Sequence, residues 1–142
     1  MSRKKSLKKT NPPNQALLPP TLKQVERTDK PEPFLIVGVG ASAGGLEAFT
    51  QLLTSLPANT GMAFVLIQHL HPKHENMSAE IFSRITRMPV VEVKNGMHVE
   101  PNHVYVIPPN CGMGISRRIL HLMPRKEVRG QHLVINSFFQ SL

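Results

Sequence analysis

Cysteine, aspartate and long apolar runs are all scarce in this sequence of 142 residues. Cys111 is the only cysteine, so the chain can form no internal disulfide, and this usage fits a reducing compartment. No stretch approaches the length of a membrane-spanning helix, and the N-terminal region lacks the apolar segment of a secretory signal. These absences predict a cytoplasmic protein that does not insert into a membrane.

Acidic residues are few, and the excess of positive charge lies at one end of the chain. The formal net charge is +8, and residues 1–30 supply six of these charges. Prolines interrupt the same region, which has few apolar residues to bury. We therefore predict a disordered basic leader over residues 1–33 and one domain over residues 34–142. The leader could attract nucleic acid or an anionic membrane weakly. No specific nucleic-acid partner is predicted.

A glycine-rich loop with a serine inside it is the most informative feature of the chain. It has the sequence Gly-Val-Gly-Ala-Ser-Ala-Gly-Gly over residues 38–45. A short apolar run precedes it, and leucines and Phe49 recur at helical spacing after it. The N–H groups at a helix start can hold an anion or stabilise an oxyanion beside Ser42. The loop is therefore a phosphate cradle, the site of a nucleophile, or a device for tight packing.

Strand and helix patterns alternate from residue 34 onward. Apolar runs predict strands at 34–39, 62–67, 89–93 and 103–107, and periodicity predicts helices at 43–56 and about 76–87, the latter with a stripe of Met77, Ile81 and Ile85. The alternation over residues 115–123 predicts an edge strand or hairpin. The composition of 108–112 predicts a turn. A helix is predicted to start at 135–142, with Asn136 as its cap. This order predicts an α/β fold with three Rossmann-like layers and a mainly parallel sheet.

The end of the second predicted strand supplies a partner for the serine. His69 follows this strand directly, as Ser42 follows the first strand. Carboxyl ends of neighbouring parallel strands meet at one edge of a sheet, where ligands bind in such folds. Serine as nucleophile and histidine as its base is therefore the favoured hypothesis. Cys111 is a poor nucleophile candidate because it has no evident base nearby in the sequence.

Two other chemistries use the same residues. A dinucleotide-binding fold also opens a helix after a glycine loop, but it usually ends its second strand with an acidic residue, where this chain has Gln68 and His69. His69, His71 and His74 with Glu75 could bind zinc, but alternate residues of an extended segment point to opposite sides. We favour neither, and we expect no metal and no cofactor.

The combined motifs closely resemble the catalytic domain of the CheB-type protein-glutamate methylesterases of bacterial chemotaxis, which act on chemoreceptors. The resemblance covers residues 34–142. It rests on the serine loop, on a Gln-His pair that places His69 27 residues after Ser42, and on three further segments: Lys94-Asn95-Gly96, residues 99–109 and residues 132–142.

The resemblance implies a reaction and roles for four residues. It implies hydrolysis of receptor glutamate methyl esters, often with deamidation of receptor glutamines. Ser42 would be the nucleophile, His69 the base, and the amides beside Ala43 and Gly44 the oxyanion site. Ala43 departs from family members that have a threonine there. The implied partners are the cytoplasmic helices of methylated chemoreceptors.

The chain departs from the family pattern in its acid. The aspartate of the family's triad lies in a Gly-Met-Gly-x-Asp-Gly motif beyond the position of Leu142, and Asp29 is the only aspartate here. We therefore expect a domain truncated on its C-terminal side, with impaired activity. The alternative is a non-catalytic fragment that binds a receptor or partner. Because its leader is short, the chain resembles the esterase modules that open fusions with a receptor methyltransferase, which makes such a domain a candidate partner.

Overall fold

Four parallel strands form the central sheet of the protein. The computed structural model describes residues 32–42, 44–68, 78–124, 127–128 and 131–142. Sheet A has the order β1 (Ile36–Ala41), β2 (Ala63–Gln68), β5 (Val104–Val106) and β3 (Val90–Glu92). β1 and β2 pair from Ile36 with Ala63 to Ala41 with Gln68. The first five residues of β2 are buried, as the continuous apolar run of a strand covered on both faces predicts.

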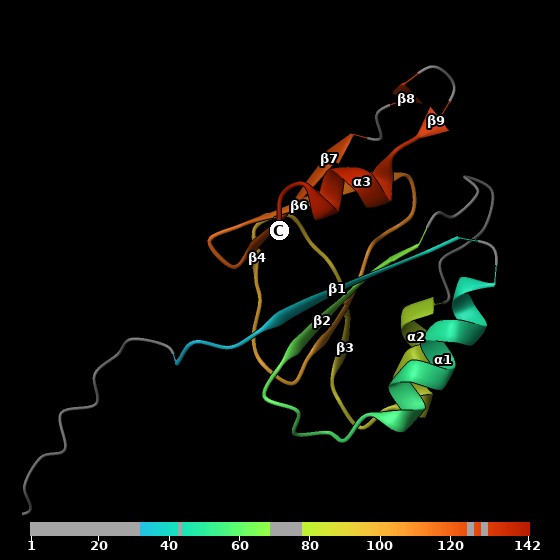
Figure 1. Cartoon of the computed structure of the whole chain (residues 1–142), viewed down its shortest axis with the longest axis vertical. Coiled ribbons are helices and arrows are strands. Elements are labelled where there is room, and N and C mark those ends of the chain that lie inside the picture. The colour runs from blue at the N-terminus through green and yellow to red at the C-terminus, as the bar shows by residue number, and fades with distance from the viewer. Residues whose placement is uncertain (1–31, 43, 69–77, 125–126, 129–130) are drawn as a thin grey trace, which may run out of the picture. The chain divides into compact units, whose positions relative to one another are not determined.

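Two helices cover one face of sheet A. α1 (Gly45–Ser55) and α2 (Ser78–Ile85) lie side by side on that face (Figure 1). Phe49 of α1 and Phe82 of α2 meet edge to face, with ring centroids 5.9 Å apart. They pack with Leu53 against Phe64 and Leu66 of β2. These two residues of β2 are two positions apart and therefore share a face of the sheet.

An antiparallel sheet and a short helix cover the other face. β6 (Cys111–Ser116) and β7 (Ile119–Pro124) form a hairpin, and β4 (Met97–His98) pairs with β7. α3 (Val134–Phe139) packs beside β6 (Figure 1). Phe138 is fully buried there, in a core shared with Val65 and Ile67 of β2. A further pair of short strands, β8 (Glu127–Val128) and β9 (Gln131–His132), is antiparallel.

The α/β class, the parallel sheet and the order of its elements are confirmed, with element ends shifted by a few residues. The third layer is a helix with an antiparallel sheet, which the alternating pattern predicted only in part. A hairpin is present, but β7 is the middle strand of sheet B and not an edge. Arg117 and Arg118 form its two-residue turn, and both have positive φ, as in the turns that match strand twist. The predicted alternation of residues 115–123 is interrupted at this turn. In β7, after the turn, Leu120 is buried and His121 is exposed.

Three smaller predictions are corrected. Asn136 does not cap the last helix, because α3 begins at Val134 after Leu133. The predicted turn at 108–112 is shorter, since Cys111 already begins β6 and the turn lies at Pro109 and Asn110. In α2 the fully buried side chain is Phe82, between the expected Ile81 and Ile85, which are only partly buried. Met77 lies outside the residues that the structure describes.

None of the helices described is long and apolar enough to cross a bilayer. Residues 1–31 of the predicted leader lie outside the described part of the chain.

Candidate active site

Ser42 lies at the carboxyl end of β1, between the strand and the first helix. It is exposed, and its carbonyl accepts a hydrogen bond from the Gly45 N–H at 3.0 Å. Gly44 has φ 79°, a conformation that costs an L-residue about 1–2 kcal/mol. A Cβ at Gly44 would meet no atom within 4 Å, so its backbone conformation is what requires glycine there. The chain thereby turns sharply and starts α1 three residues after the serine. Ala43 is outside the described residues.

The turn points the start of α1 toward the region of the serine. The first N–H groups of a helix have no partner within the helix and carry its positive dipole end. Gly44 is the N-cap of α1, and no side chain caps the helix there. Glu47 lies in the same first turn. Backbone N–H donors would therefore lie near an anionic group that forms next to Ser42. The Glu47 carboxylate would compete with this group for the same positive end of the helix.

Gly45 allows the loop to approach the next strand. A Cβ built on Gly45 would lie 2.6 Å from the Ala41 Cβ and 3.3 Å from the Gln68 Nε2. The first of these separations is shorter than Cβ atoms tolerate, so glycine is required by close approach here. The end of β1, the start of α1 and the end of β2 thus pack directly on one another.

The register of the sheet aligns the carboxyl ends of β1 and β2, the strands that precede the two predicted residues. Ala41 pairs with Gln68, and the next residues in the chain are Ser42 and His69. The prediction that strands one and two are neighbours is confirmed. His69 itself, with His71, His74 and Glu75 of the zinc hypothesis, lies outside the described residues. The roles of Ser42, His69, Ala43 and Gly44 stay predictions.

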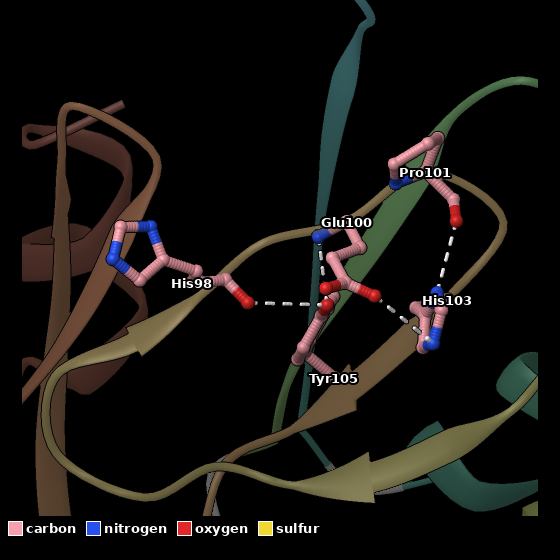
Figure 2. A network of polar contacts seen from close by, with 5 residues as sticks. All are labelled: His98, Glu100, Pro101, His103 and Tyr105. Carbon is pink, nitrogen blue, oxygen red and sulfur yellow. Dashed lines mark hydrogen bonds and ion pairs between the residues drawn. The ribbon is translucent and has the colours of Figure 1, made fainter. Parts of the chain in front are cut away.

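A second polar cluster lies at the opposite edge of the sheet, before β5 (Figure 2). The Tyr105 hydroxyl accepts a hydrogen bond from the Glu100 N–H at 2.8 Å and lies 3.4 Å from the His98 carbonyl oxygen. His103 Nδ1 lies 2.9 Å from the Pro101 carbonyl oxygen, and its Nε2 lies 3.8 Å from a carboxylate oxygen of Glu100. Burial raises the pKa of the Tyr105 phenol, and the nearby Glu100 carboxylate adds to this, against the backbone hydrogen bond.

This cluster is structural rather than catalytic in its placement. It ties the segment before β5 together, whereas ligands in parallel sheets bind at the carboxyl ends of the strands. The sequence did not predict this cluster, because His103 and Tyr105 fit the pattern of an ordinary strand. The Pro-Asn pair at 101 and 102, a turn signal before the strand, was the available clue.

The fold and the loop together define a class of protein: an α/β domain with an exposed serine at the carboxyl edge of a parallel sheet, next to a helix start. Residues 37–142 match the family model described as CheB methylesterase. The chain therefore belongs to the CheB methylesterase family.

Curated relatives carry the corresponding names. A protein-glutamate methylesterase/protein-glutamine glutaminase of Pseudomonas aeruginosa is 32% identical over 111 residues, which are 75% of this chain and 32% of the relative. One of Photorhabdus laumondii is 35% identical over 82 residues, or 58% of this chain and 23% of the relative. The chain thus spans about a third or less of the length of these relatives.

A solved structure supports the fold. The Thermotoga maritima CheB methylesterase catalytic domain superposes with a TM-score of 0.64 at 20% identity, over 76% of this chain and 59% of that one. At this identity the likeness concerns the fold alone. Family membership favours the nucleophile hypothesis for the serine loop over the phosphate and dinucleotide hypotheses.

Proposed function

We propose that this chain carries the nucleophile and base of a protein-glutamate methylesterase. The observation that carries the proposal is the exposed Ser42 at the end of β1, in register with the end of β2, whose next residue is His69. Membership of the CheB methylesterase family supports it. The start of the family match at residue 37 also supports a domain over 34–142 that follows a separate leader at 1–33.

The proposed reaction is an acyl transfer to serine followed by hydrolysis. Ser42 Oγ attacks the carbonyl carbon of a glutamate γ-methyl ester while His69 takes the hydroxyl proton. The carbonyl oxygen becomes an oxyanion that the amides beside Ala43 and Gly44 stabilise, typically by about 3 kcal/mol per donor. The bond to the methoxy group then breaks, and His69 returns the proton to the leaving methanol. Water then takes the place of methanol: His69 takes a proton from water, whose oxygen attacks the acyl carbon. The bond to Ser42 breaks, Ser42 regains the proton, and glutamate is released.

The proposed substrates are the methylated cytoplasmic helices of chemoreceptors, and their glutamines are candidate substrates for deamidation with release of ammonia. The proposal places the reaction in the cytoplasm, and it includes a receptor methyltransferase domain as a candidate partner. The proposed ester hydrolysis and the proposed deamidation need neither a metal nor a cofactor. The names of the relatives, which pair a methylesterase with a glutaminase, support this choice of two carbonyl substrates.

Among these 142 residues, no acidic residue stands at a position that matches the aspartate of the family's triad. Asp29, the only aspartate, lies in the predicted leader. Loss of the orienting acid from such a triad typically lowers turnover on the order of 10⁴-fold and leaves residual catalysis. We therefore propose slow turnover for the 142-residue chain, with Ser42 still required.

Methanol release from methylated receptor tests the proposal. Ser42→Ala should reduce the rate well below that of the parent chain, to the residual level that the oxyanion site and substrate binding alone support. Ser55→Ala is the matched control, because this serine sits at the end of α1 with its hydroxyl bonded to the Gln51 carbonyl. Equal rates for the parent chain and Ser42→Ala would overturn the proposal. Receptor binding without any methanol release would favour a binding fragment instead.

A further inference from the structure

Gln68 is a polar residue at the end of the most buried strand, next to the serine loop. It is the last residue of β2 and pairs with Ala41, which directly precedes Ser42. Its side chain reaches toward the start of α1, where its Nε2 would lie 3.3 Å from a Cβ at Gly45. The carboxamide thus occupies space that the missing side chain of Gly45 leaves open.

The oxygen of the Gln68 amide is buried without a described hydrogen-bond partner. Gln68 Oε1 has almost no exposure and accepts no hydrogen bond from the part of the chain that the structure describes. A buried acceptor left unpaired costs about 1–3 kcal/mol, and an apolar side chain of the same shape would avoid this cost. Gln68 also lines a cavity of about 10 Å³ with Pro108 and Cys111, where there is space for one water molecule at most.

Contacts on three sides make the amide part of the loop's support. The end of β1 lies beside it through the sheet register, the start of α1 lies against its nitrogen, and the turn after β5 lies on the cavity side. The amide therefore lies between the end of β2 and the start of α1. The same loop carries Ser42 three residues earlier.

We propose that Gln68 is a positioning residue that holds the serine loop in its reactive shape. The inference rests on the proposed role of Ser42. Gln68 itself touches no substrate: it acts through Gly45 and the loop. Misplacement of a reacting group by about 1 Å can cost on the order of 100-fold in rate. A polar residue kept at some cost in stability next to a nucleophile is the pattern expected of a functional site.

Gln68→Met tests this role, with Gln51→Met as its matched control. Methionine has a similar length but replaces the planar amide by a flexible thioether. Gln51 is exposed on α1, and among the described residues its side chain donates a hydrogen bond only to Glu47, at 3.4 Å. A fluorophosphonate is the probe, because Ser42 Oγ can displace its fluoride and form a stable bond to phosphorus. The maximal rate of labelling and the half-saturating probe concentration are measured separately, with the thermal midpoint.

The expected result separates positioning from folding. Gln68→Met should lower the maximal labelling rate about tenfold, with an unchanged half-saturating concentration and an equal or higher thermal midpoint. Gln51→Met should change none of these. A lower midpoint with an unchanged maximal rate would overturn the inference and leave the role of Ser42 intact. A parent chain labelled no faster than Ser42→Ala would count against the proposed function itself.

Hydrogen exchange at the loop gives a readout that needs no reaction. The Gly45 N–H, which donates to the Ser42 carbonyl, should exchange several-fold faster in Gln68→Met than in the parent chain or Gln51→Met. Equal protection of this amide in all three chains would overturn the inference, whatever the labelling rates are.

Discussion

The two edges of the parallel sheet are built in opposite ways. At the amino edge, the segment before β5 is tied by side chains: Tyr105 binds Glu100, and the Asn102 side chain accepts a hydrogen bond from the Gly61 N–H at 2.7 Å. At the carboxyl edge, glycines shape the backbone, Ser42 is exposed, and the Gln68 oxygen has no described partner. Polar groups at the first edge satisfy one another, whereas at the second edge the exposed Ser42 is the polar group open to solvent.

This contrast explains why the titratable cluster is not the proposed site. His103 and Glu100 form the kind of pair that invites a catalytic interpretation, but both lie before the start of β5, the strand that carries Tyr105 (Figure 2). The proposed reaction takes place at the carboxyl edge, where fewer side-chain hydrogen bonds are described. Mutations at the two edges should therefore separate activity from stability.

Ser42→Ala should have the largest effect of all on activity and almost none on stability. Ser42 is exposed and its hydroxyl makes no described hydrogen bond, so its loss should leave the thermal midpoint within about 3 °C, in line with the small effects of surface substitutions. Methanol release and thermal unfolding are measured on the same preparation. A midpoint several degrees lower would mean that Ser42 supports the fold, and the contrast between the edges would weaken.

Gly45→Ala should disturb both properties at the carboxyl edge. Its methyl group would stand 2.6 Å from the Ala41 Cβ, an overpacking that typically costs about 1–3 kcal/mol. We expect slower serine labelling together with a lower free energy of unfolding, measured by urea titration. Gly44→Ala is the comparison, because it meets no atom and costs only the positive φ, about 1–2 kcal/mol. Equal labelling in Gly45→Ala and the parent chain would contradict the packing account of the loop.

Tyr105→Phe should lower stability and leave labelling unchanged. The substitution removes the acceptor of the Glu100 N–H, a partly buried hydrogen bond, and the loss of such a bond typically costs about 0.5–1.5 kcal/mol. Urea unfolding and fluorophosphonate labelling are again compared in one preparation. A fall in the maximal labelling rate of the folded protein would show that the two edges are coupled, contrary to the account.

The smallest expected effect is a loss of stability at high pH. The pKa of Tyr105 is raised above its usual value near 10, so the folded state holds the phenol proton more tightly than the unfolded state does. The resulting stability is fully present below pH 10 and is lost as the pH rises through the folded-state pKa. Tyr105 is the only tyrosine and the chain has no tryptophan, so ultraviolet absorption reports its ionisation directly. A titration midpoint at or below that of the urea-unfolded chain would contradict the burial of this phenol.

The sequence predicted the central sheet well because its signals are local. Four apolar runs marked the strands, and a glycine loop before a helical pattern marked the turn at Ser42. Parallel topology then predicted that β1 and β2 are neighbours, which the pairing of Ala41 with Gln68 confirms.

What the sequence did not predict depends on conformations with weak sequence signals. The hairpin turn uses positive φ at two arginines, residues that rarely adopt it, so the position of the turn was not predicted. The Tyr105 contacts depend on a loop that reverses at Asn102, with φ 59°. The support of the serine loop by Gln68 needs the packing of three elements, which no local pattern encodes.

Locating the residue that an active-site reagent modifies tests the central claim most directly. The intact chain is treated with the fluorophosphonate, digested, and mapped by mass spectrometry. The account predicts that the phosphonyl group is found on Ser42, and that Ser42→Ala remains unmodified under the same conditions. Modification at other hydroxyl groups with Ser42 left free would contradict the assignment of this serine as the nucleophile.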